Sequence, residues 1–337
     1  MASEWARIDL LTRVLGGAGA NGEAPGAERP GVRLGIGDDA AILEGGPAPL
    51  VWTVDAAVDG VHFRRDLLSF EDIGYRATMA AVSDLAAMGA EPLGVLSALI
   101  LPEALTDREL EALARGQREA ADALGTAVIG GNLARGGELS ITTTALGRSA
   151  RPLTRSGAQP GDGLFLAGDV GLAGAGLALL LAGAAGSGSA GGASLSAAGR
   201  VAVAAWRRPR ARLDAGRAAA LAGASAAIDV SDGLAQDVGH LARASGVRVV
   251  LEASALVTPE LAAVAAELGR DALTLALHGG EDYALVVALP AGQQAEGLLR
   301  IGTCEAAGEG AGGEVVLRRA DGVLEAVKAK GFDHFAR

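Results

Sequence analysis

Lysine is almost absent from this chain of 337 residues: only Lys328 and Lys330 occur, both near the C-terminus. No Gly-Lys-Ser or Gly-Lys-Thr sequence exists, so the usual lysine of a phosphate-binding loop is missing. A core lysine that forms a Schiff base with a carbonyl substrate is not expected either. The common lysine-based machinery for phosphates and carbonyl compounds is therefore excluded.

Cysteine and aromatic residues are also scarce, and basic residues are outnumbered by acidic ones, 29 to 40. The single Cys304 excludes an internal disulfide framework and cysteine-cluster zinc sites, and none of the four histidines forms a short zinc-type pair with another. Aromatic residues make up only 3% of a chain that is 50% apolar, which is too apolar for a disordered protein. A net charge of −11 argues against a nucleic-acid backbone or an anionic membrane as the main partner. A reducing cytoplasm is the expected location.

No segment indicates secretion or membrane insertion. Residues 1–14 carry charges of both signs and do not form a signal peptide. Residues 170–199 are uncharged, but Gly, Ala and Ser dominate their flanks and transfer weakly into hydrocarbon. We expect a buried helix there, followed by a flexible linker at Gly183–Gly192.

Short β-like runs alternate with longer helical ones, which predicts a mixed α/β fold. Pro152 and the glycine-containing stretch 156–161 indicate a boundary, so we expect two α/β domains at 1–149 and 150–337. The expected helices are 72–88, 107–124 and 172–181. The expected strands are 51–54, 94–101, 127–129, 141–146, 164–166, 226–230, 247–251 and 284–289.

Aspartates gather in four clusters at the ends of apolar runs, where α/β sheets present ligands. The clusters lie at 37–40, 54–62, 82–85 and 228–233. Carboxylate oxygens are preferred by hard divalent cations, and Mg²⁺ bridges one or two of them to substrate phosphates. Any one of these aspartates alone fits a helix cap or a turn equally well. Together, the four clusters favour a metal site.

Two aspartates have distinctive surroundings. Asp232 follows a predicted strand and precedes a predicted helix, so backbone N–H groups at this turn are expected to be free for phosphate. Asp84 lies within an apolar helix, where a carboxylate needs a partner or a metal unless it faces solvent. The glycines of GIGDDA at 35–40 resemble a dinucleotide fingerprint, but two carboxylates there would repel a pyrophosphate.

Three other segments carry less specific signals. Gly131 and Asn132 follow the strand at 127–129, where either a ligand-approaching backbone or a plain tight turn fits. Glu281 follows two glycines before the strand at 284–289, and it fits either a substrate contact or a simple loop. Arg155 fits either a phosphate contact or an interdomain salt bridge.

Eight segments in order resemble the thiamine-monophosphate kinase family, within the superfamily of aminoimidazole ribonucleotide synthetase and selenophosphate synthetase. The resemblance runs from about Gly35 to Phe335. The segments are GIGDDAAIL, TVDAAVDGVHF, SDLAAMGAEP, GGNLARG, LTRSGAQPGD, IDVSDGLAQDVGHL, HGGEDYAL and KGFDHF. The resemblance implies an N-terminal α/β domain whose sheet pairs with that of a second subunit, giving a homodimer. It implies a C-terminal domain that closes over nucleotide and substrate.

The resemblance also implies roles for individual residues. Magnesium ligands would be Asp38, Thr53, Asp55, Asp84, Asp229 and Asp232, of which Asp55, Asp84 and Asp232 would form the catalytic core. ATP contacts would be Gly131, Asn132, Arg155 and Ser231, and thiamine monophosphate contacts would be His62, Glu281 and Phe332. Two positions depart from many relatives. Asn132 replaces a metal-binding Asp, and Val54 replaces a hydroxyl residue.

The implied reaction is the last step of thiamine diphosphate synthesis: ATP phosphorylates thiamine monophosphate. The acceptor is already an oxyanion, so no general base is needed, and several Mg²⁺ ions would bring the two polyanions together for direct in-line transfer. His62 and Glu281 would position the thiamine moiety. Two alternatives remain at this point: another ATP-using enzyme of the superfamily, and a non-catalytic homodimer that binds Mg-nucleotide.

Overall fold

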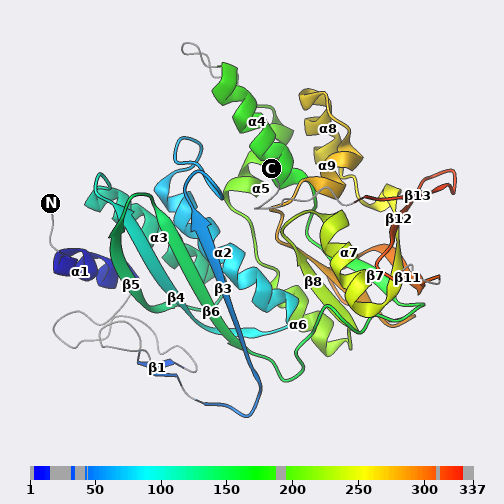
Figure 1. Ribbon diagram of the computed structural model, residues 1–337, viewed down its shortest axis with the longest axis horizontal. Coiled ribbons are helices and arrows are strands. Elements are labelled where there is room, and N and C mark those ends of the chain that lie inside the picture. Colours follow the sequence, from blue (N-terminus) through cyan, green and yellow to red (C-terminus); the bar gives the residue numbers. More distant parts are fainter. Residues whose placement is uncertain are drawn as a thin grey trace. The chain divides into compact units, whose positions relative to one another are not determined.

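The chain folds into two compact units, which the computed structural model in Figure 1 describes over residues 4–15, 32–34, 42–43, 45–186, 195–308 and 312–328. The first unit comprises Met1–Leu85 and Ala90–Ala150, and the second comprises Ala86–Gly89 and Arg151–Arg337. The chain thus passes between units after Ala150, one residue beyond the boundary that the sequence suggests.

The first unit contains a four-stranded sheet in the order β3-β6-β4-β5. Its strands are β3 (Leu50–Val58), β4 (Glu91–Pro102), β5 (Val128–Gly136) and β6 (Ser140–Arg148). Neighbouring strands are antiparallel except β4 and β5, which are parallel because a helix connects them. The other elements are α1 (Glu4–Leu15), α2 (Phe70–Ala87), α3 (Asp107–Ala123) and the pair β1 (Val32–Leu34) and β2 (Ile42–Leu43).

Helices α2 and α3 cover one face of this sheet and pack tightly against each other (Figure 1). A capping box of Thr106 and Glu109 starts α3, and each side chain satisfies a backbone N–H of the other residue. A Cβ atom on Gly116 would lie 1.8 Å from the carbonyl oxygen of Glu71. Glycine is therefore required where α3 crosses α2.

The second unit contains a seven-stranded sheet in the order β13-β12-β9-β11-β7-β10-β8. All its neighbouring strands are antiparallel except β12 and β9. The strands are β7 (Gly163–Ala167), β8 (Ala226–Val230), β9 (Val247–Glu252), β10 (Ala284–Leu289), β11 (Leu299–Ala306), β12 (Val315–Arg318) and β13 (Leu324–Ala326). The helices are α4 (Leu172–Gly186), α5 (Ala197–Arg207), α6 (Leu213–Leu221), α7 (Leu234–Ser245), η1 (Ala253–Ala255), α8 (Pro259–Leu268) and α9 (Ala272–His278).

Both faces of the second sheet are buried. Along β10, Val286 belongs to the large apolar cluster shared with α7, α8 and α9, whereas Leu285 and Val287 belong to a smaller cluster with residues of α6. Since successive side chains of a strand point to opposite faces, a strand covered on both sides is apolar throughout. This explains why 284–289 is a continuous apolar run.

The predicted mixed α/β class is confirmed, and the strands at 226–230 and 284–289 begin and end at the predicted residues. Of the two alternatives left open after the strand at 127–129, the plain tight turn is wrong, because pairing with β4 continues β5 to Gly136. The predicted linker is wrong in its first part, since α4 extends to Gly186; residues 187–192 lie outside the described residues. Across the described residues, no helix combines the length and the apolarity that crossing a membrane requires.

Candidate active site

In the first unit, β3 and α2 bring three of the predicted metal ligands together. Thr53 and Asp55 lie two residues apart on β3, so their side chains point to the same face of the sheet. Asp84 lies on α2, which covers that face, and its Oδ2 accepts a hydrogen bond from the Thr53 hydroxyl. The partnership explains how the apolar α2 accommodates a carboxylate at this position, which is neither fully buried nor fully exposed.

Asp55 is exposed on β3, but its carboxyl group lies close to the protein surface around it and to the charge of Asp84. Desolvation by the surrounding protein, together with the negative charge of Asp84, raises its pKa to about 6. Both effects oppose ionisation, and a cation between the two carboxylates would reverse the second one. Two carboxylates and a hydroxyl that meet in this way form an oxygen-rich place for a hard cation.

His62 is held at the end of β3. Its Nδ1 accepts the backbone N–H of Val58 at 3.1 Å, in the tight turn that follows the strand. An accepting Nδ1 leaves Nε2 as the protonated nitrogen of the neutral ring. The ring is thus oriented to offer a hydrogen-bond donor rather than to act as a base.

Gly131 and Asn132 lie inside β5. Each belongs to a different row of residues that lie side by side across the paired strands of the sheet. Gly131 pairs with Ser97, Ser97 with Thr143, and Thr143 with Asp55, so the predicted nucleotide and metal positions share one row. A Cβ atom on Gly131 would lie 1.9 Å from the Ser97 carbonyl oxygen, so only glycine fits.

Asn132 occupies the next row, with Ala98, Thr142 and Ala56. Because side chains alternate along a strand, Asn132 is placed on the face opposite to Asp55. Within this unit, the fold therefore does not bring Asn132 to the Asp55–Asp84 pair. Val54 also lies on that opposite face and is exposed.

In the second unit, the end of β8 presents the other acidic cluster. Asp229 is buried within β8 opposite Leu285, and Ser231 and Asp232 follow the strand directly. Gln236 of α7 donates from its side-chain amide to Oδ2 of Asp232 at 3.2 Å. Helix α7 begins after Gly233, whose φ of 119° allows the chain to turn from strand to helix.

Asp237 organises this turn, and the sequence analysis does not single it out. Its Oδ2 accepts the backbone N–H groups of Ser231, Asp232 and Gly233 at 3.0, 3.1 and 3.2 Å. The expectation that these N–H groups are free for phosphate is therefore wrong, since a carboxylate of the same chain occupies them. Desolvation, reinforced by Asp232 and Asp229, raises the Asp237 pKa to about 7. An Asp in the first turn of a helix after a Ser-Asp-Gly turn is the signal that indicates such a contact.

Arg155 lies on the same side of this unit as α7. Its carbonyl oxygen accepts the Ser245 hydroxyl at 3.1 Å, which ties the loop before β7 to the end of that helix. Desolvation lowers the pKa of His240, and the charges of Arg243 and Arg155 lower it further while Asp232 opposes them. Arg155 and Asp232 are therefore both within electrostatic reach of His240.

Glu281 lies in a loop with unusual backbone geometry. Its φ is 59° and that of Tyr283 is 48°, both in the left-handed region that non-glycine residues seldom adopt. Its Oε2 accepts the indole N–H of Trp206 on α5 at 2.8 Å, and its backbone N–H donates to the carbonyl oxygen of Ser231 at 2.7 Å. Two of the predicted site positions of this unit, Ser231 and Glu281, are thus in direct contact.

The chain resembles known proteins over most of its length. Residues 37–149 match the model of the N-terminal domain of AIR synthase related proteins. Thiamine-monophosphate kinase of Mycobacterium tuberculosis is 36% identical over 288 residues, covering 84% of this chain and 79% of that protein. The Salmonella typhimurium enzyme of the same name is 35% identical over 323 residues, covering 92% and 94%.

A solved complex of AaThiL with AMPPCP and TMP superimposes with a TM-score of 0.77 at 31% identity, covering 98% of this chain and 97% of that one. The chain belongs to the thiamine-monophosphate kinase family. The resemblance stated from the eight sequence segments is thereby confirmed, and so is the prediction of a phosphotransferase.

Two of the residues that family resemblance assigns to the site, Asp38 and Phe332, lie outside the described residues. Among the residues that are described, no three His, Cys, Asp or Glu side chains come close enough to hold a metal ion between them. The oxygen donors nevertheless suit Mg²⁺, which uses only one or two protein carboxylates and completes its shell with phosphate and water.

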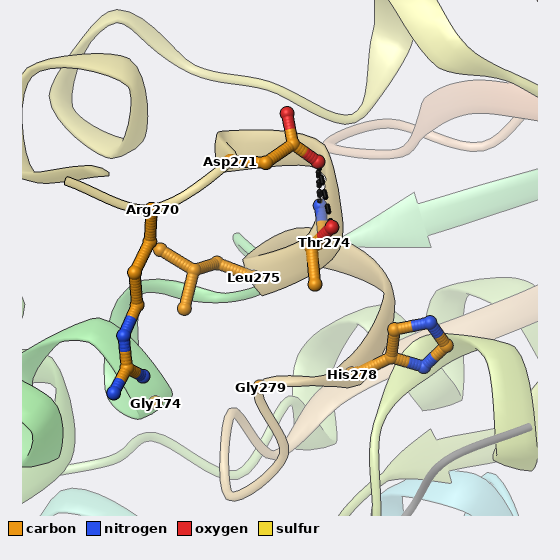
Figure 2. A pocket seen from close by; sticks show the side chains of 7 residues that line it. All are labelled: Gly174, Arg270, Asp271, Thr274, Leu275, His278 and Gly279. Carbon is orange, nitrogen blue, oxygen red and sulfur yellow. Dashed lines mark hydrogen bonds between the residues drawn. The ribbon is translucent and has the colours of Figure 1, made fainter. Parts of the chain in front are cut away.

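A cavity of about 430 Å³ lies at His278 and Gly279, shortly before β10 (Figure 2). It is lined by Gly174, Arg270, Asp271, Thr274, Leu275, His278 and Gly279. In Figure 2 the side chains of Arg270 and His278 point in different directions, and Asp271 accepts the hydroxyl and backbone N–H of Thr274. None of the predicted site residues lines this cavity.

Proposed function

We propose that this protein carries out the reaction of its family, the ATP-dependent phosphorylation of thiamine monophosphate to thiamine diphosphate, by direct in-line transfer. The contact of Thr53 and Asp84 beside Asp55 carries the mechanistic part of this proposal. A protein with a net charge of −11 repels polyphosphates overall, so bringing two of them together calls for added positive charge. Closely placed carboxylates are the arrangement that recruits divalent cations for that purpose.

Magnesium is the cation that the donor set favours. Thr53, Asp55 and Asp84 would hold it in the first unit, and Asp229 and Asp232 in the second, with Asp38 as a further ligand. When bound, Mg²⁺ neutralises phosphate charge and orients the attacking and leaving oxygens. The hydroxyl of Thr53 keeps the Asp84 carboxylate in place for this role.

The residues themselves bind and orient the two substrates. Gly131, Asn132, Arg155 and Ser231 contact ATP, and His62, Glu281 and Phe332 contact thiamine monophosphate. The acceptor phosphate is already an oxyanion near neutral pH, so the chain supplies no general base. The Nε2–H of His62 offers a donor to the substrate, and the Glu281 carboxylate faces its ring cation. No phosphoenzyme is formed.

The exposed face of the first sheet supports a homodimer. Leu50, Trp52 and Val54 of β3 are 64%, 71% and 61% exposed, and all three lie on the face opposite to Asp55. Leu96 and Ile100 of β4 extend this apolar face. An apolar sheet face of this kind is typical of a protein interface, and Asn132 lies beside it.

The proposed location is the cytoplasm, and the only cysteine fits a reducing compartment. Cys304 is buried in β11, and burial raises its pKa to about 12, so it is not a reactive thiol. The test of the function is ADP release on addition of thiamine monophosphate, compared with unphosphorylated thiamine. Stimulation by the phosphate ester alone is expected, because an alcohol acceptor needs a different site, with a base placed to take the hydroxyl proton. Equal turnover of thiamine would refute the assignment.

A further inference from the structure

The segment that ends in Glu281 is held in a conformation that its own residues do not favour. Glu281 and Tyr283 both have positive φ, although neither is glycine, and they flank Asp282. Such a backbone costs free energy and persists only when surrounding contacts hold it. The contacts that hold it therefore decide where the Glu281 carboxylate lies.

Asp282 supplies contacts of this kind. It is buried, and its two carboxylate oxygens accept different backbone N–H groups: Oδ2 that of Gly171 at 2.8 Å, and Oδ1 that of Ala173 at 3.1 Å. Both donors lie at the start of α4, 109 and 111 residues away in the chain. The side chain thus ties the loop to the first turn of a helix packed in the core of the same unit.

The helix approaches this loop as closely as a backbone can. A Cβ atom on Gly174 would lie 2.7 Å from the Cα of Gly279, and one on Gly171 would lie 2.7 Å from the backbone nitrogen of Ala276. Because these positions accept no larger residue, the start of α4 forms a fixed surface against residues 275–279. The Gly171 and Ala173 N–H groups that Asp282 binds therefore lie in a rigid part of this unit.

Backbone hydrogen bonds complete the attachment on the other side of the loop. The N–H of Glu281 donates to the carbonyl oxygen of Ser231 at 2.7 Å, and that of Tyr283 donates to the carbonyl oxygen of Val230 at 2.8 Å. Asp282 is hydrogen-bonded to the start of α4, and Glu281 and Tyr283 are hydrogen-bonded to the end of β8. The Glu281 side chain is thereby directed to the indole N–H of Trp206.

We infer that Asp282 is a positioning residue for the thiamine site. It touches no substrate, and its hydrogen bonds to the first turn of α4 set the position of the Glu281 carboxylate. The inference rests on the proposed contact between Glu281 and thiamine monophosphate. It differs from a purely structural role, because loss of Asp282 should change substrate binding and the surroundings of Trp206 beyond any general loss of stability.

Asp282→Asn is the sharpest variant. Asn keeps the shape but has one acceptor oxygen, so its amide NH₂ must face either the Gly171 or the Ala173 N–H. Steady-state kinetics at pH 8 should show the KM for thiamine monophosphate raised at least 10-fold, with kcat changed less than 3-fold. In an Asp282→Asn, Glu281→Gln double variant the KM should stay within 2-fold of Glu281→Gln alone, because both changes remove the same contact.

Asp162→Asn is the matched control. Asp162 is also buried in this unit and accepts the Gln159 N–H and the Ser225 hydroxyl, away from Glu281. It should lower the unfolding midpoint as Asp282→Asn does, without changing the KM. If Asp282→Asn does not fold, Ala173→Pro removes one of the two donors and leaves Asp282 in place, since proline is tolerated in the first turn of a helix. A smaller rise in KM is then expected.

Trp206 fluorescence gives a readout that does not depend on the reaction. With Trp5 and Trp52 replaced by Phe, the emission maximum without substrate should shift in Asp282→Asn and stay unchanged in Asp162→Asn. A folded Asp282→Asn protein with unchanged emission and a KM within 2-fold of the parent overturns the inference. If Glu281→Gln itself leaves the KM unchanged, the proposed thiamine contact fails, and the emission alone then decides whether Asp282 positions Glu281.

Discussion

One carboxylate oxygen of Asp237 accepts the backbone N–H of Asp232 at 3.1 Å, and the same oxygen accepts those of Ser231 and Gly233. The turn that carries two predicted site residues is therefore shaped before any ligand arrives. A strand-to-helix turn with free N–H groups would bind phosphate through its backbone. Here Asp237 occupies those N–H groups, so in the proposed site the phosphate charge would be met by cations and by Arg155.

Replacement of Asp237 tests how much its three hydrogen bonds to the turn stabilise the fold. Asp237→Ala leaves three backbone donors without their acceptor, and we expect the free energy of unfolding to fall by about 3 kcal/mol. Asp237→Asn retains an acceptor oxygen and should lose only about 1 kcal/mol. Urea unfolding of both variants measures the difference. Equal stability of the Ala variant and the parent would show that the three bonds contribute nothing.

Turnover should depend on the charge of the proposed metal-binding aspartates. Asp55→Asn, Asp84→Asn and Asp232→Asn each keep the shape of the side chain but remove a charged oxygen, so turnover should fall more than about 100-fold. The Mg²⁺ concentration for half-maximal activity should rise, because the remaining oxygens bind the ion less tightly.

Asp66→Asn is the control for these variants, since Asp66 is exposed and pairs with Arg64. Turnover against Mg²⁺ concentration, with thermal unfolding measured alongside, separates lost ligands from lost stability. A structural aspartate tolerates Asn with little loss. Near-normal rates with an unchanged Mg²⁺ midpoint in all three variants would mean that these aspartates are structural.

The route of transfer predicts that no phosphoryl group stays on the protein. The acceptor is a competent nucleophile and Cys304 is buried, so incubation with labelled ATP alone should leave the chain unlabelled. Samples quenched in acid and samples kept at neutral pH would be separated on gels, and the label in the protein band would be counted. Phosphoaspartate or phosphohistidine would appear as label on the protein. A stoichiometric label that thiamine monophosphate discharges would contradict direct transfer.

The buried Asp282 should make stability depend on pH. Desolvation raises its pKa from 3.8 to about 7, against the two N–H groups that favour ionisation. A raised carboxyl pKa stabilises the fold below pH 3.8, and this contribution is lost as the pH rises through 7. Between pH 4 and pH 8 the loss is about 4 kcal/mol at most.

Asp282→Asn cannot titrate, so its free energy of unfolding should decline less over this range than that of the parent. Urea unfolding at pH 5, 6, 7 and 8 gives the two profiles, and their difference isolates Asp282 from the other titrating groups. Parallel profiles would show that the folded-state pKa is not raised.

The proposed homodimer can be tested at its most exposed aromatic residue. Trp52→Glu places a charge on the apolar face of the first sheet, on its edge strand β3, and we expect light scattering to show a shift from dimer to monomer. Leu221→Glu is the matched control, because Leu221 is 90% exposed at the end of α6 in the second unit. A Trp52→Glu protein that keeps the parent mass would place any interface elsewhere.

The sequence by itself determined the class of fold, about half of the regular elements and the family. These depend on local patterns: the apolar run at 284–289 predicts a buried strand, the pattern at 107–124 followed by Gly125 predicts a helix, and eight ordered segments carry the family resemblance. The acidic clusters were recognisable too, because short carboxylates at the ends of apolar runs stand out in a chain with so few lysines.

Only the tertiary structure decided which of these side chains meet. Thr53 and Asp84 are 31 residues apart, and Asp282 and Gly171 are 111 apart, so their contacts depend on strand pairing and helix packing that no local pattern encodes. The continuation of β5 through Gly130 and Gly131 depends in the same way on hydrogen bonds from β4. Asp237 appeared unremarkable in sequence because its role lies in the backbone groups around it, and the positions of those groups are set by the fold.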